Sequence, residues 1–443
     1  MFLPKAAKYC IDALEAAGFR AFAVGGCVRD ALLGLTPADY DLCTNAKPAQ
    51  ICQVFAAHQL LHHGEKHGTV GIVLENEVYE ITTFRTEGGY QDNRHPSWVR
   101  FVEDVTEDLA RRDFTVNAMA FNPGTGVIDP FGGQEDLKNH ILRAVRDPRQ
   151  RFQEDALRIL RGARFSARFH LAPEQETLSA MLELAPLMEN LARERVFEEL
   201  CKLLAFADVH DLQVFAPLIA QVIPELGVCI GFEQHTPHHR YDVFTHTAHV
   251  VEAVPKELVL RWAALLHDVG KPRSFTRDEN GRGHFKGHAK VSAQMADDIL
   301  LRLKAPTALR QQVTELIAQH MTPLEADKKL LRRRLGKLGQ EMLEQLLILQ
   351  EADMGSKGTG NIEDLGQFTA IRTCLAEVLR EEACFSIKDL AINGKDLLQT
   401  GVAPGPWIGN CLSKLLELVQ DETLPNEKEV LLASAKAILE EML

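Results

Sequence analysis

The sequence predicts an α+β fold, in which a compact head of mixed strands and helices precedes a long, almost entirely helical body. Before about residue 150, short apolar runs alternate with helical patterns. After that point the patterns are helical, and segments rich in glycine, proline and polar residues separate them. The 443 residues allow two to four domains, and 46% hydrophobic with 25% charged residues is typical of a globular protein.

The first elements of the head follow from periodicity and from glycines. Residues 4–17 have helical periodicity that stops at Gly18. The run RAFAV, residues 20–24, predicts a short strand, and GGCVRDALLG, residues 25–34, predicts a glycine turn that opens a helix. The run ADYDLC, residues 38–43, predicts a second strand. The head therefore begins with a helix, a strand, a turn with its helix, and an acidic strand.

The rest of the head contains a second helix, a hairpin and a loop. A helix that starts at a proline is predicted over 48–57, and β-branched residues over 69–84 predict a hairpin divided at Glu75 and Asn76. The segment RTEGGYQDNRHPSWVRF, residues 85–101, is rich in glycine, proline and polar residues, so we expect a mobile loop.

Charge is distributed unevenly along the chain. The formal net charge of −13 argues against indiscriminate coating of nucleic acid, because phosphate binding depends on lysine and arginine. Two basic clusters stand out: Arg143, Arg146, Arg149, Arg151, Arg158, Arg161, Arg164 and Arg168, and then Lys328, Lys329, Arg332, Arg333, Arg334 and Lys337. Each is compatible with a local basic surface or with a solvated helix face.

Composition also bears on the compartment. We find no stretch of about 18 uncharged apolar residues, and the opening MFLPKAAKYCIDALEAAG carries charges where a secretory signal needs an apolar run. The nine cysteines are scattered without a CxxC pair, which favours neither a zinc ribbon nor a disulfide framework. We therefore expect a cytoplasmic protein with no membrane partner and mostly reduced core cysteines.

The DYD run places two carboxylates where they could hold a metal. Asp39 and Asp41 are two apart on the predicted strand and share a face, about 7 Å apart along the chain. Paired carboxylates can hold Mg²⁺, although a lone DxD is more often a solvated turn. Just upstream, backbone amides near Gly26 could approach a triphosphate that Arg29 grips. Glu80, on a neighbouring predicted strand, is either a third acid or a solvent-facing residue.

A further motif completes an ordered set. RRDFTVNAMAFNP, residues 111–123, would on its own suit a charged N-terminal cap. Together with VGGCVRD, DYD, DPFGGQEDL and EDALRILRGARF, in this order and spacing, it resembles the class II tRNA nucleotidyltransferase and poly(A) polymerase family. That family belongs to the DNA polymerase beta-like nucleotidyltransferases. The resemblance is dense over residues 20–230 and implies a polymerase beta-like head.

The resemblance also implies roles for single residues. Asp39 and Asp41 match the family's metal-binding acids, and Gly26 and Arg29 match its triphosphate-binding turn. Spacing favours Arg112 over Arg111 as the arginine before the DFT segment. The family's nucleotide-binding helix is matched by Asp155, Arg158, Arg161 and Arg164.

The spacing of Asp155 and Arg158 suits recognition of a base. Three apart on a helix, the two would be neighbours. Asp155 could accept from the exocyclic amine of cytosine or adenine while Arg158 donates to the adjacent ring nitrogen, so CTP and ATP fit and uracil and guanine do not. An ordinary helix pair between Glu154 and Arg158 is the alternative, and Arg164 falls nearly opposite Asp155 in projection, which leaves its role open.

A second set of side chains lies in the helical body. Histidines and carboxylates from several helices can converge on divalent metals that generate hydroxide for phosphate-ester hydrolysis, although a single helical histidine is usually a core or surface residue. The ordered motifs FTHTAHV, LLHDVGKP, FKGHAK, AQHM and LQEADMGSK resemble the HD phosphohydrolase superfamily. The resemblance implies an HD domain, a divalent metal of open identity and a hydrolytic side activity. Its four primary metal ligands would be His246, His267, Asp268 and Asp353, with His288 and His320 as additional ligands.

The two resemblances imply one main activity. We expect template-independent addition of C, C and A to tRNA 3′ ends from CTP and ATP, with the arginine-rich neck and helical body meeting the tRNA. A CC-adding enzyme, an A-adding enzyme, a poly(A) polymerase, a primary HD phosphohydrolase and a non-catalytic RNA-binding protein are the alternatives. The loop over 85–101 favours full addition, because the family's CC-adding members lack its equivalent, and the non-basic tail favours tRNA over poly(A) synthesis. The expected domains are a head over 1–148, a neck over 149–235, an HD-type domain over 236–360 and a C-terminal helical region over 361–443.

Overall fold

The computed structural model describes residues 3–62, 64–88, 98–237, 239–358, 366–381, 386–400 and 403–442. The chain divides into two units: a first unit of residues 1–227 with 302–304, and a second unit of residues 228–301 with 305–443. The first unit carries the large sheet, and the second is almost entirely helical, so the predicted α+β class is confirmed. No helix in these described ranges is long and apolar enough to cross a membrane.

A seven-stranded mixed sheet forms the base of the head, with the order β3-β4-β5-β2-β1-β8-β9. Its strands are β1 Ala21–Val24, β2 Leu42–Thr44, β3 Gln59–Leu61, β4 Thr69–Leu74, β5 Glu77–Thr83, β8 Ala120–Asn122 and β9 Gly126–Ile128. Only β2 and β5 pair in parallel; the other neighbours are antiparallel. The strand β1 is buried along its whole length, so the sheet's centre forms part of the head core.

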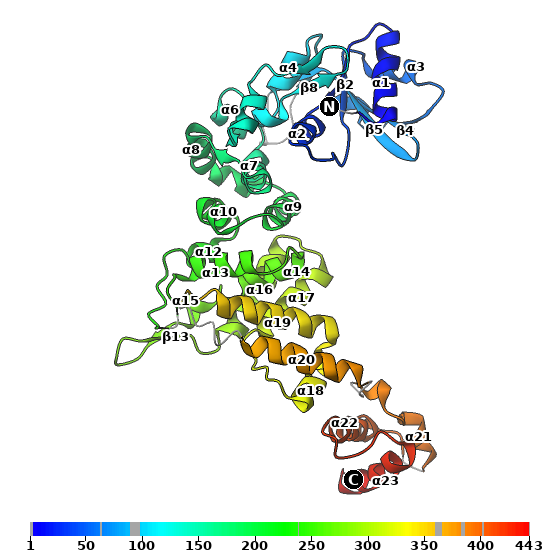
Figure 1. The fold of residues 1–443 in the computed structure, drawn as a ribbon, viewed down its shortest axis with the longest axis vertical. Helices are drawn as coiled ribbons and strands as arrows, with labels where there is room; N and C mark the ends of the chain where they lie inside the picture. Colours follow the sequence, from blue (N-terminus) through cyan, green and yellow to red (C-terminus); the bar gives the residue numbers. More distant parts are fainter. Residues whose placement is uncertain are drawn as a thin grey trace. The chain divides into compact units, whose positions relative to one another are not determined.

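Short helices surround this sheet. They are α1 Lys5–Ala16, α2 Gly26–Leu32, α3 Pro48–Val54, α4 Val105–Ala110 and α5 Gly133–Lys138, with the 3₁₀ turns η1 Glu65–His67 and η2 Thr115–Asn117. Figure 1 shows α1 and α3 beside the sheet. The helix α1 turns Cys10, Ile11 and Leu14 into the core, as its periodicity predicts. The predicted elements of the head are therefore present, with two corrections.

The first correction concerns the acidic strand. The strand β2 begins at Leu42, so Asp39 and Asp41 precede it instead of lying within it. The carbonyl of Asp41 still accepts the amide of Val24 at 2.9 Å, but the regular ladder starts one residue later. Aspartate is unfavourable in strands, and both carboxylates lie before the first residue of β2. The hairpin after β3 is as predicted, because Glu75 and Asn76 both have positive φ, as a two-residue turn requires.

The second correction concerns the segment 85–101, which we expected to be a mobile loop. Its two ends pair as an antiparallel ribbon of β6 Arg85–Gly88 and β7 Trp98–Phe101. A Cβ at Gly88 would lie 2.7 Å from the ring of Trp98, so glycine lets that ring close over the ribbon. The middle of the predicted loop, residues 89–97, lies outside the described residues.

Helices complete the first unit. They are α6 Pro148–Glu154, α7 Leu157–Phe169, α8 Gln175–Glu183, α9 Arg193–Leu204, α10 Val209–Val214, α11 Ala216–Val222 and α12 Pro224–Gly227, with the 3₁₀ turn η3 Ala185–Asn190 and a parallel pair of β10 Ile141–Leu142 and β11 Ala172–Pro173. The helix α7 is buried on most sides and packs against α9. The predicted helix through EDALRILRGARFSAR is thus two helices. Asp155 is extended, at φ −140° and ψ 103°, and its carboxylate accepts the amide of Leu157, a local bond that competes with helix formation.

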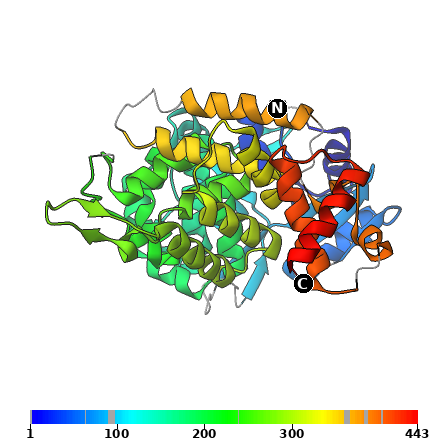
Figure 2. The ribbon, with the colours of Figure 1, turned by 90° about the horizontal axis from the view of Figure 1, so that it is seen from below.

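The second unit is a helical assembly. Its helices are α13 Val243–Ala253, α14 Leu258–Leu266, α15 Lys271–Ser274, α16 His288–Arg302, α17 Thr307–Gln319, α18 Lys328–Leu338, α19 Gln340–Gly355, α20 Gly366–Arg380, α21 Gly394–Gln399, α22 Pro406–Gln420 and α23 Lys428–Met442, with the 3₁₀ turn η5 Ile387–Asp389. A ribbon of β12 Thr276–Arg277 and β13 Gly283–His284 stands out from them, as Figure 2 shows. The helices α13, α14, α17 and α19 pack together, while α21, α22 and α23 enclose a core of their own around Leu415 and Leu431.

The basic cluster over 328–337 lies on α18, and three of its six basic residues form ion pairs with residues that the structure describes. Lys328 and Arg332 contact Glu381 at 2.6 and 2.8 Å, and Arg333 contacts Asp421 at 2.6 Å. These ion pairs join α18 to the ends of α20 and α22, and Arg332 is buried, so these three residues form neither a free basic surface nor a simple solvated face. The cysteines in the described ranges are all free, and five of them are buried, as expected of reduced core residues.

Candidate active site

The first unit contains a polar cavity of about 410 Å³. It is lined by Gly26, Arg29, Asp39, Asp41, Arg111, Arg112, Asp113, Asn117, Asp155, Arg158, Arg161, Arg164, Phe165, Arg168 and Arg195. Among these described residues eight arginines face four aspartates, although the chain as a whole carries a net charge of −13. Such a local excess of positive charge fits a polyanionic ligand.

Asp39 and Asp41 form the acidic wall of this cavity. Within the part of the chain that the structure describes, neither side chain has a hydrogen bond or an ion pair. The pKa of Asp41 is raised, first by the loss of solvent around the carboxyl and then by the charge of Asp39, while Arg112 opposes the rise. Two unpaired carboxylates that repel each other fit a hard divalent cation, which supplies the missing positive charge.

The glycine turn lies beside this wall. Gly25 has φ +79°, and a Cβ there would come within 2.7 Å of the Arg112 guanidinium, so only glycine fits. Arg29, four residues on, is almost fully buried. Its guanidinium donates to the carboxylate of Asp30 at 2.6 and 2.8 Å and to the amide oxygen of Asn117 at 2.5 Å. The contact of Arg29 with a triphosphate stays a prediction, and three of its five N–H groups already have partners.

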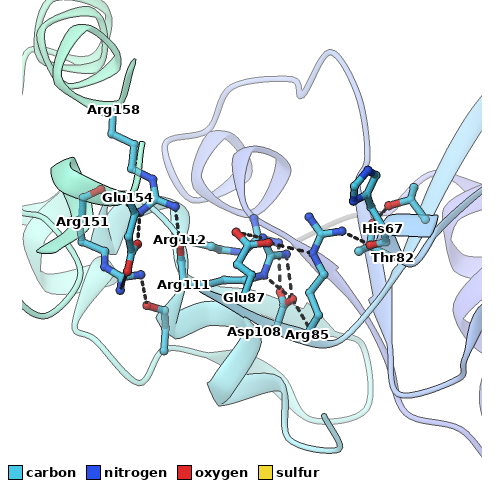
Figure 3. Close-up of polar contacts among 12 residues, drawn as sticks. His67, Thr82, Arg85, Glu87, Asp108, Arg111, Arg112, Arg151, Glu154 and Arg158 are labelled. Atoms are coloured by element: carbon cyan, nitrogen blue, oxygen red, sulfur yellow. Dashed lines mark hydrogen bonds and ion pairs between the residues drawn. The ribbon is translucent and has the colours of Figure 1, made fainter. Parts of the chain in front are cut away.

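Two neighbouring arginines share one buried acid that the sequence did not single out. Asp108, on α4, is fully buried and accepts from Arg111 at 2.9 and 3.0 Å and from Arg112 at 3.5 Å. It also accepts the backbone amide of Arg85 at the start of β6, and Figure 3 shows it between these groups. Burial opposes its charge, but Arg111 and then Arg112 outweigh burial and lower the pKa of Asp108. Both arginines line the cavity, so the geometry does not decide between them.

Asp113 joins the head to α7. It is buried, and its carboxylate accepts from Arg161 at 2.8 Å and from the side-chain amide of Asn117 at 3.0 Å. Burial opposes ionisation, but Arg161, Asn117 and Arg158 together outweigh it, and the pKa of Asp113 is lowered. Because Asn117 also accepts from Arg29, a continuous chain of hydrogen bonds runs from the glycine turn to α7. The roles of Asp113 and Asn117 were missed; their spacing of four in RRDFTVN was the available signal.

Asp155 and Arg158 both face the cavity, although not as neighbours on one helix. Asp155 occupies the break between α6 and α7, where its carboxylate accepts the amide of Leu157 at 3.0 Å. Arg158 donates to Glu154 at 2.8 Å and to the carbonyls of Arg151 and Arg111 at 3.1 and 2.9 Å (Figure 3). The contact between Glu154 and Arg158 exists as the alternative predicted, yet two N–H groups of Arg158 remain for a ligand. Base recognition by this pair stays a prediction.

Two further residues differ from expectation or remain open. Arg164 was expected nearly opposite Asp155, but the break before α7 invalidates that single-helix projection, and both residues line the same cavity. Arg164 contacts Glu199 on α9 at 3.2 Å and lies 4.3 Å from the ring centre of Phe165. Glu80 is an exposed residue of β5 outside the cavity lining; its charge still contributes to the raised pKa of Asp41.

A second cluster lies in the second unit, and it contains all six side chains expected at the HD site. His246 comes from α13, His267 and Asp268 follow α14, His288 begins α16, His320 follows α17 and Asp353 lies on α19. The Nε2 atom of His246 is 3.0 Å from Asp353 and 3.5 Å from Asp268, and that of His267 is 3.1 Å from Asp268. Asp268 also lies 3.3 Å from His288 and 4.0 Å from His320. His249, in contrast, stacks on Tyr241 outside the cluster.

The orientation of the four imidazoles suits metal ligation. Each Nδ1 atom is within 2.7–3.2 Å of a backbone carbonyl, those of Ser356, Ala264, Phe285 and Ile317. Every Nε2 atom then points toward the carboxylates, because a carbonyl that binds Nδ1 leaves Nε2 free to bind a metal. The Nε2 atom of His267 and both oxygens of Asp268 are buried without a hydrogen bond of proper geometry, although Lys271 lies 2.7 Å from Asp268. Orphaned buried atoms of these types fit a divalent cation.

Similarity to known proteins extends along the whole chain. Residues 21–143 match the poly A polymerase head domain, residues 168–212 match a probable RNA- and SrmB-binding site of polymerase A, and residues 283–435 match tRNA nucleotidyltransferase domain 2. The CCA-adding enzyme of Enterococcus faecalis is 33% identical over 438 residues, which cover 98% of this chain and 95% of that protein. The chain belongs to the family of CCA-adding enzymes. The CCA-adding enzyme of Latilactobacillus sakei is 35% identical over 430 residues and 96% of each chain.

Solved structures of CCA-adding enzymes have the same fold. The Bacillus stearothermophilus enzyme, solved in complex with CTP, is 27% identical with a TM-score of 0.74, covering 100% of this chain and 99% of that chain. The Thermotoga maritima enzyme, solved with tRNA, is 19% identical with a TM-score of 0.62, covering 100% and 97%, and supports the fold alone. The predicted membership of the tRNA nucleotidyltransferase and poly(A) polymerase family is confirmed.

Two of the matched regions contribute residues to the cavity. The head match over 21–143 includes Asp39, Asp41, Arg111 and Arg112. The match over 168–212 includes Arg195 of α9, a cavity residue that was not predicted from the sequence. The match over 283–435 crosses the expected boundary at 360. The domain bounds and the residue roles stay predictions.

Proposed function

We propose that this protein adds C, C and A to the 3′ ends of tRNA from CTP and ATP, without a nucleic-acid template, and releases pyrophosphate. The arginine-rich cavity with an unpaired carboxylate pair on its wall is the observation that supports this function most directly. In each addition the 3′ oxygen of the tRNA bonds to the α-phosphorus of the triphosphate, and the bond to the departing pyrophosphate breaks.

The chain's own residues supply binding, orientation and choice. Asp39 and Asp41 would hold Mg²⁺, which promotes attack by the 3′-hydroxyl and neutralises the triphosphate when bound. Gly26 of the glycine turn and Arg112 line the cavity, where backbone amides and the guanidinium would bind the triphosphate. Arg161 is held by Asp113 and would contact the ribose or the phosphates of the nucleotide.

The partners follow from the same surface. We expect the tRNA backbone to be bound by shape and charge through the neck and body, because an acidic chain offers only local basic surfaces for phosphate. A cytoplasmic location belongs to this proposal, since the free cysteines of the described ranges suit a reducing compartment.

Sequencing the products made from tRNAs that end before C, after C and after CC tests the proposal directly. With Mg²⁺ and each labelled triphosphate in turn, we expect C, C and A to be added in order, and UTP and GTP to be excluded. Products that stop at CC, or that gain only A or a run of A, would instead indicate a partial enzyme or a poly(A) polymerase. No incorporation of C or A would rule the proposal out.

The variant Arg158→Ala tests base recognition. We expect discrimination against UTP and GTP to fall by about tenfold to a hundredfold, because the ring-nitrogen partner is lost. Triphosphate affinity should change less, since other arginines line the cavity. The measurement is kcat/KM for the four triphosphates. Unchanged selectivity would leave Arg158 only its contacts with Glu154 and backbone carbonyls.

A second activity is proposed for the second unit. The four imidazoles whose Nδ1 atoms are anchored on carbonyls, arranged around Asp268 and Asp353, support metal-dependent hydrolysis of phosphate esters. Lys271, Arg282 and His284 line the adjoining cavity of about 300 Å³ and could contact a phosphate. The test is hydrolysis of a 2′,3′-cyclic phosphodiester by chelator-treated protein, before and after addition of single divalent metals. If no added metal restores hydrolysis, the protein does not have this second activity. That result would not bear on the proposal of nucleotide addition.

A further inference from the structure

The cavity contains one arginine from α9, Arg195, which has no role in the proposed binding of metal, triphosphate or base. Arg195 lies in the first turn of α9, and its Nη2 atom is 3.4 Å from the carboxylate of Asp155. The two side chains are 28% and 19% exposed, so solvent screens their interaction only in part. We propose that Arg195 is a positioning residue that orients the Asp155 carboxylate and thereby sets the choice among nucleotides, an inference that rests on the proposed function.

The position of Arg195 is determined by the packing of α9 on α7. One turn further along α9, Glu199 is buried and accepts from Arg164 of α7 at 3.3 Å. The two ion pairs between these segments have opposite polarity. In one, α9 supplies the cation Arg195 to Asp155. In the other, α9 supplies the carboxylate Glu199 to Arg164 of α7. Such complementary pairs set the register of the two helices, and the buried apolar side chains of Val196 and Phe197 lie between Arg195 and Glu199 in the sequence of α9.

Asp155 needs such a partner, because the hydrogen bond from Leu157 holds only one of its two carboxylate oxygens. It lies in an extended break between two helices, and its Oδ1 atom accepts the amide of Leu157. Its Oδ2 atom has Arg195 as its side-chain partner among the described residues. The terminal torsion of aspartate is broad, so a carboxylate without that partner can rotate away from a base. An acceptor with a defined direction is what distinguishes an exocyclic amine from an oxo group.

Arg195 also presents an unsatisfied donor. Its Nη1 atom is buried and has no hydrogen-bond partner among the described residues. Buried guanidinium N–H groups usually have partners, and one left open in a cavity indicates contact with a ligand. The group that can occupy the cavity next to Asp155 is the bound nucleotide, whose exocyclic amine is a donor and therefore needs Asp155, and not Arg195, as its direct partner.

The experiment compares Arg195→Ala and Arg195→Lys with a control on the same helix, Arg193→Ala, whose guanidinium donates only to the carbonyl of Glu189 in the contacts described. We measure kcat and KM for all four triphosphates on tRNA that lacks its 3′ terminus. In Arg195→Ala we expect the preference for CTP over UTP, and for ATP over GTP, to fall by about tenfold. Arg195→Lys should recover part of the preference, and Arg193→Ala should retain all of it.

A double variant shows whether Arg195 acts through Asp155. If it does, Asp155→Asn combined with Arg195→Ala should be no less selective than Asp155→Asn alone. Unchanged selectivity in a folded Arg195→Ala variant, or an equal loss for all four triphosphates, would overturn the inference. A wild-type protein that adds neither C nor A would overturn the proposed function as well, whereas a selective wild type with an equally selective Arg195→Ala variant overturns this inference alone.

Discussion

The double variant Asp39→Asn, Asp41→Asn is expected to lose nucleotide addition by on the order of 10³-fold or more while staying folded. Both carboxylates line the cavity without partners among the described residues, so the amides disturb no existing contact there. The two amides lack the negative charge that binds a divalent cation. The measurement is the single-turnover rate of C addition to tRNA, with thermal unfolding to verify the fold.

A matched control separates loss of these acids from loss of charge in general. Asp12→Asn also converts an exposed carboxylate of the head to an amide, but it removes only an i,i+4 ion pair with Lys8 on α1. We expect normal addition from this variant. If the double variant extended tRNA at the normal rate, the assignment of Asp39 and Asp41 as metal-binding acids would be wrong.

The second large effect is expected at the cluster in the second unit. His267→Gln combined with Asp268→Asn should reduce metal-dependent phosphodiester hydrolysis to background, because His267 and Asp268 are the two most central groups of the cluster. Nucleotide addition should remain close to normal, since these residues belong to the other unit. Both assays are run on the same preparation.

The choice of substitutions matters, because both side chains are completely buried. Removing one partner of a buried charged pair costs about 3–5 kcal/mol, so amides of similar size replace both residues together. His249→Gln is the control, since His249 stacks on Tyr241 away from the cluster. Loss of nucleotide addition in a stably folded double variant would contradict the independence of the two activities.

Several features of the site were predictable because they depend on residues close together in the sequence. A glycine turn and a closely spaced acid pair are local patterns, and the structure brings Gly26, Asp39 and Asp41 to one cavity, although the two acids precede the strand on which they were predicted to lie. The hairpin at Glu75 and Asn76 is likewise a property of two turn residues. Periodicity predicted that the body is almost entirely helical, because amphipathic helices bury an apolar face.

Other features could not be predicted, because their causes lie far away in the chain. Asp108 is charged and resembles a helix-surface residue until the fold encloses it between Arg111, Arg112 and the start of β6. The break at Asp155 was missed, since helical periodicity continues through it while a single side-chain bond to Leu157 ends the first helix.

The sequence by itself determined the α+β class, the order of the elements and the identity of the chemical groups, since these follow from periodicity and from motifs at short spacing. Only the tertiary structure decided which charges meet. The helix α9 begins nearly forty residues after Asp155, yet packing places Arg195 3.4 Å from that carboxylate. An ion pair depends on distance in space, and neither composition nor spacing encodes distance between segments that packing brings together.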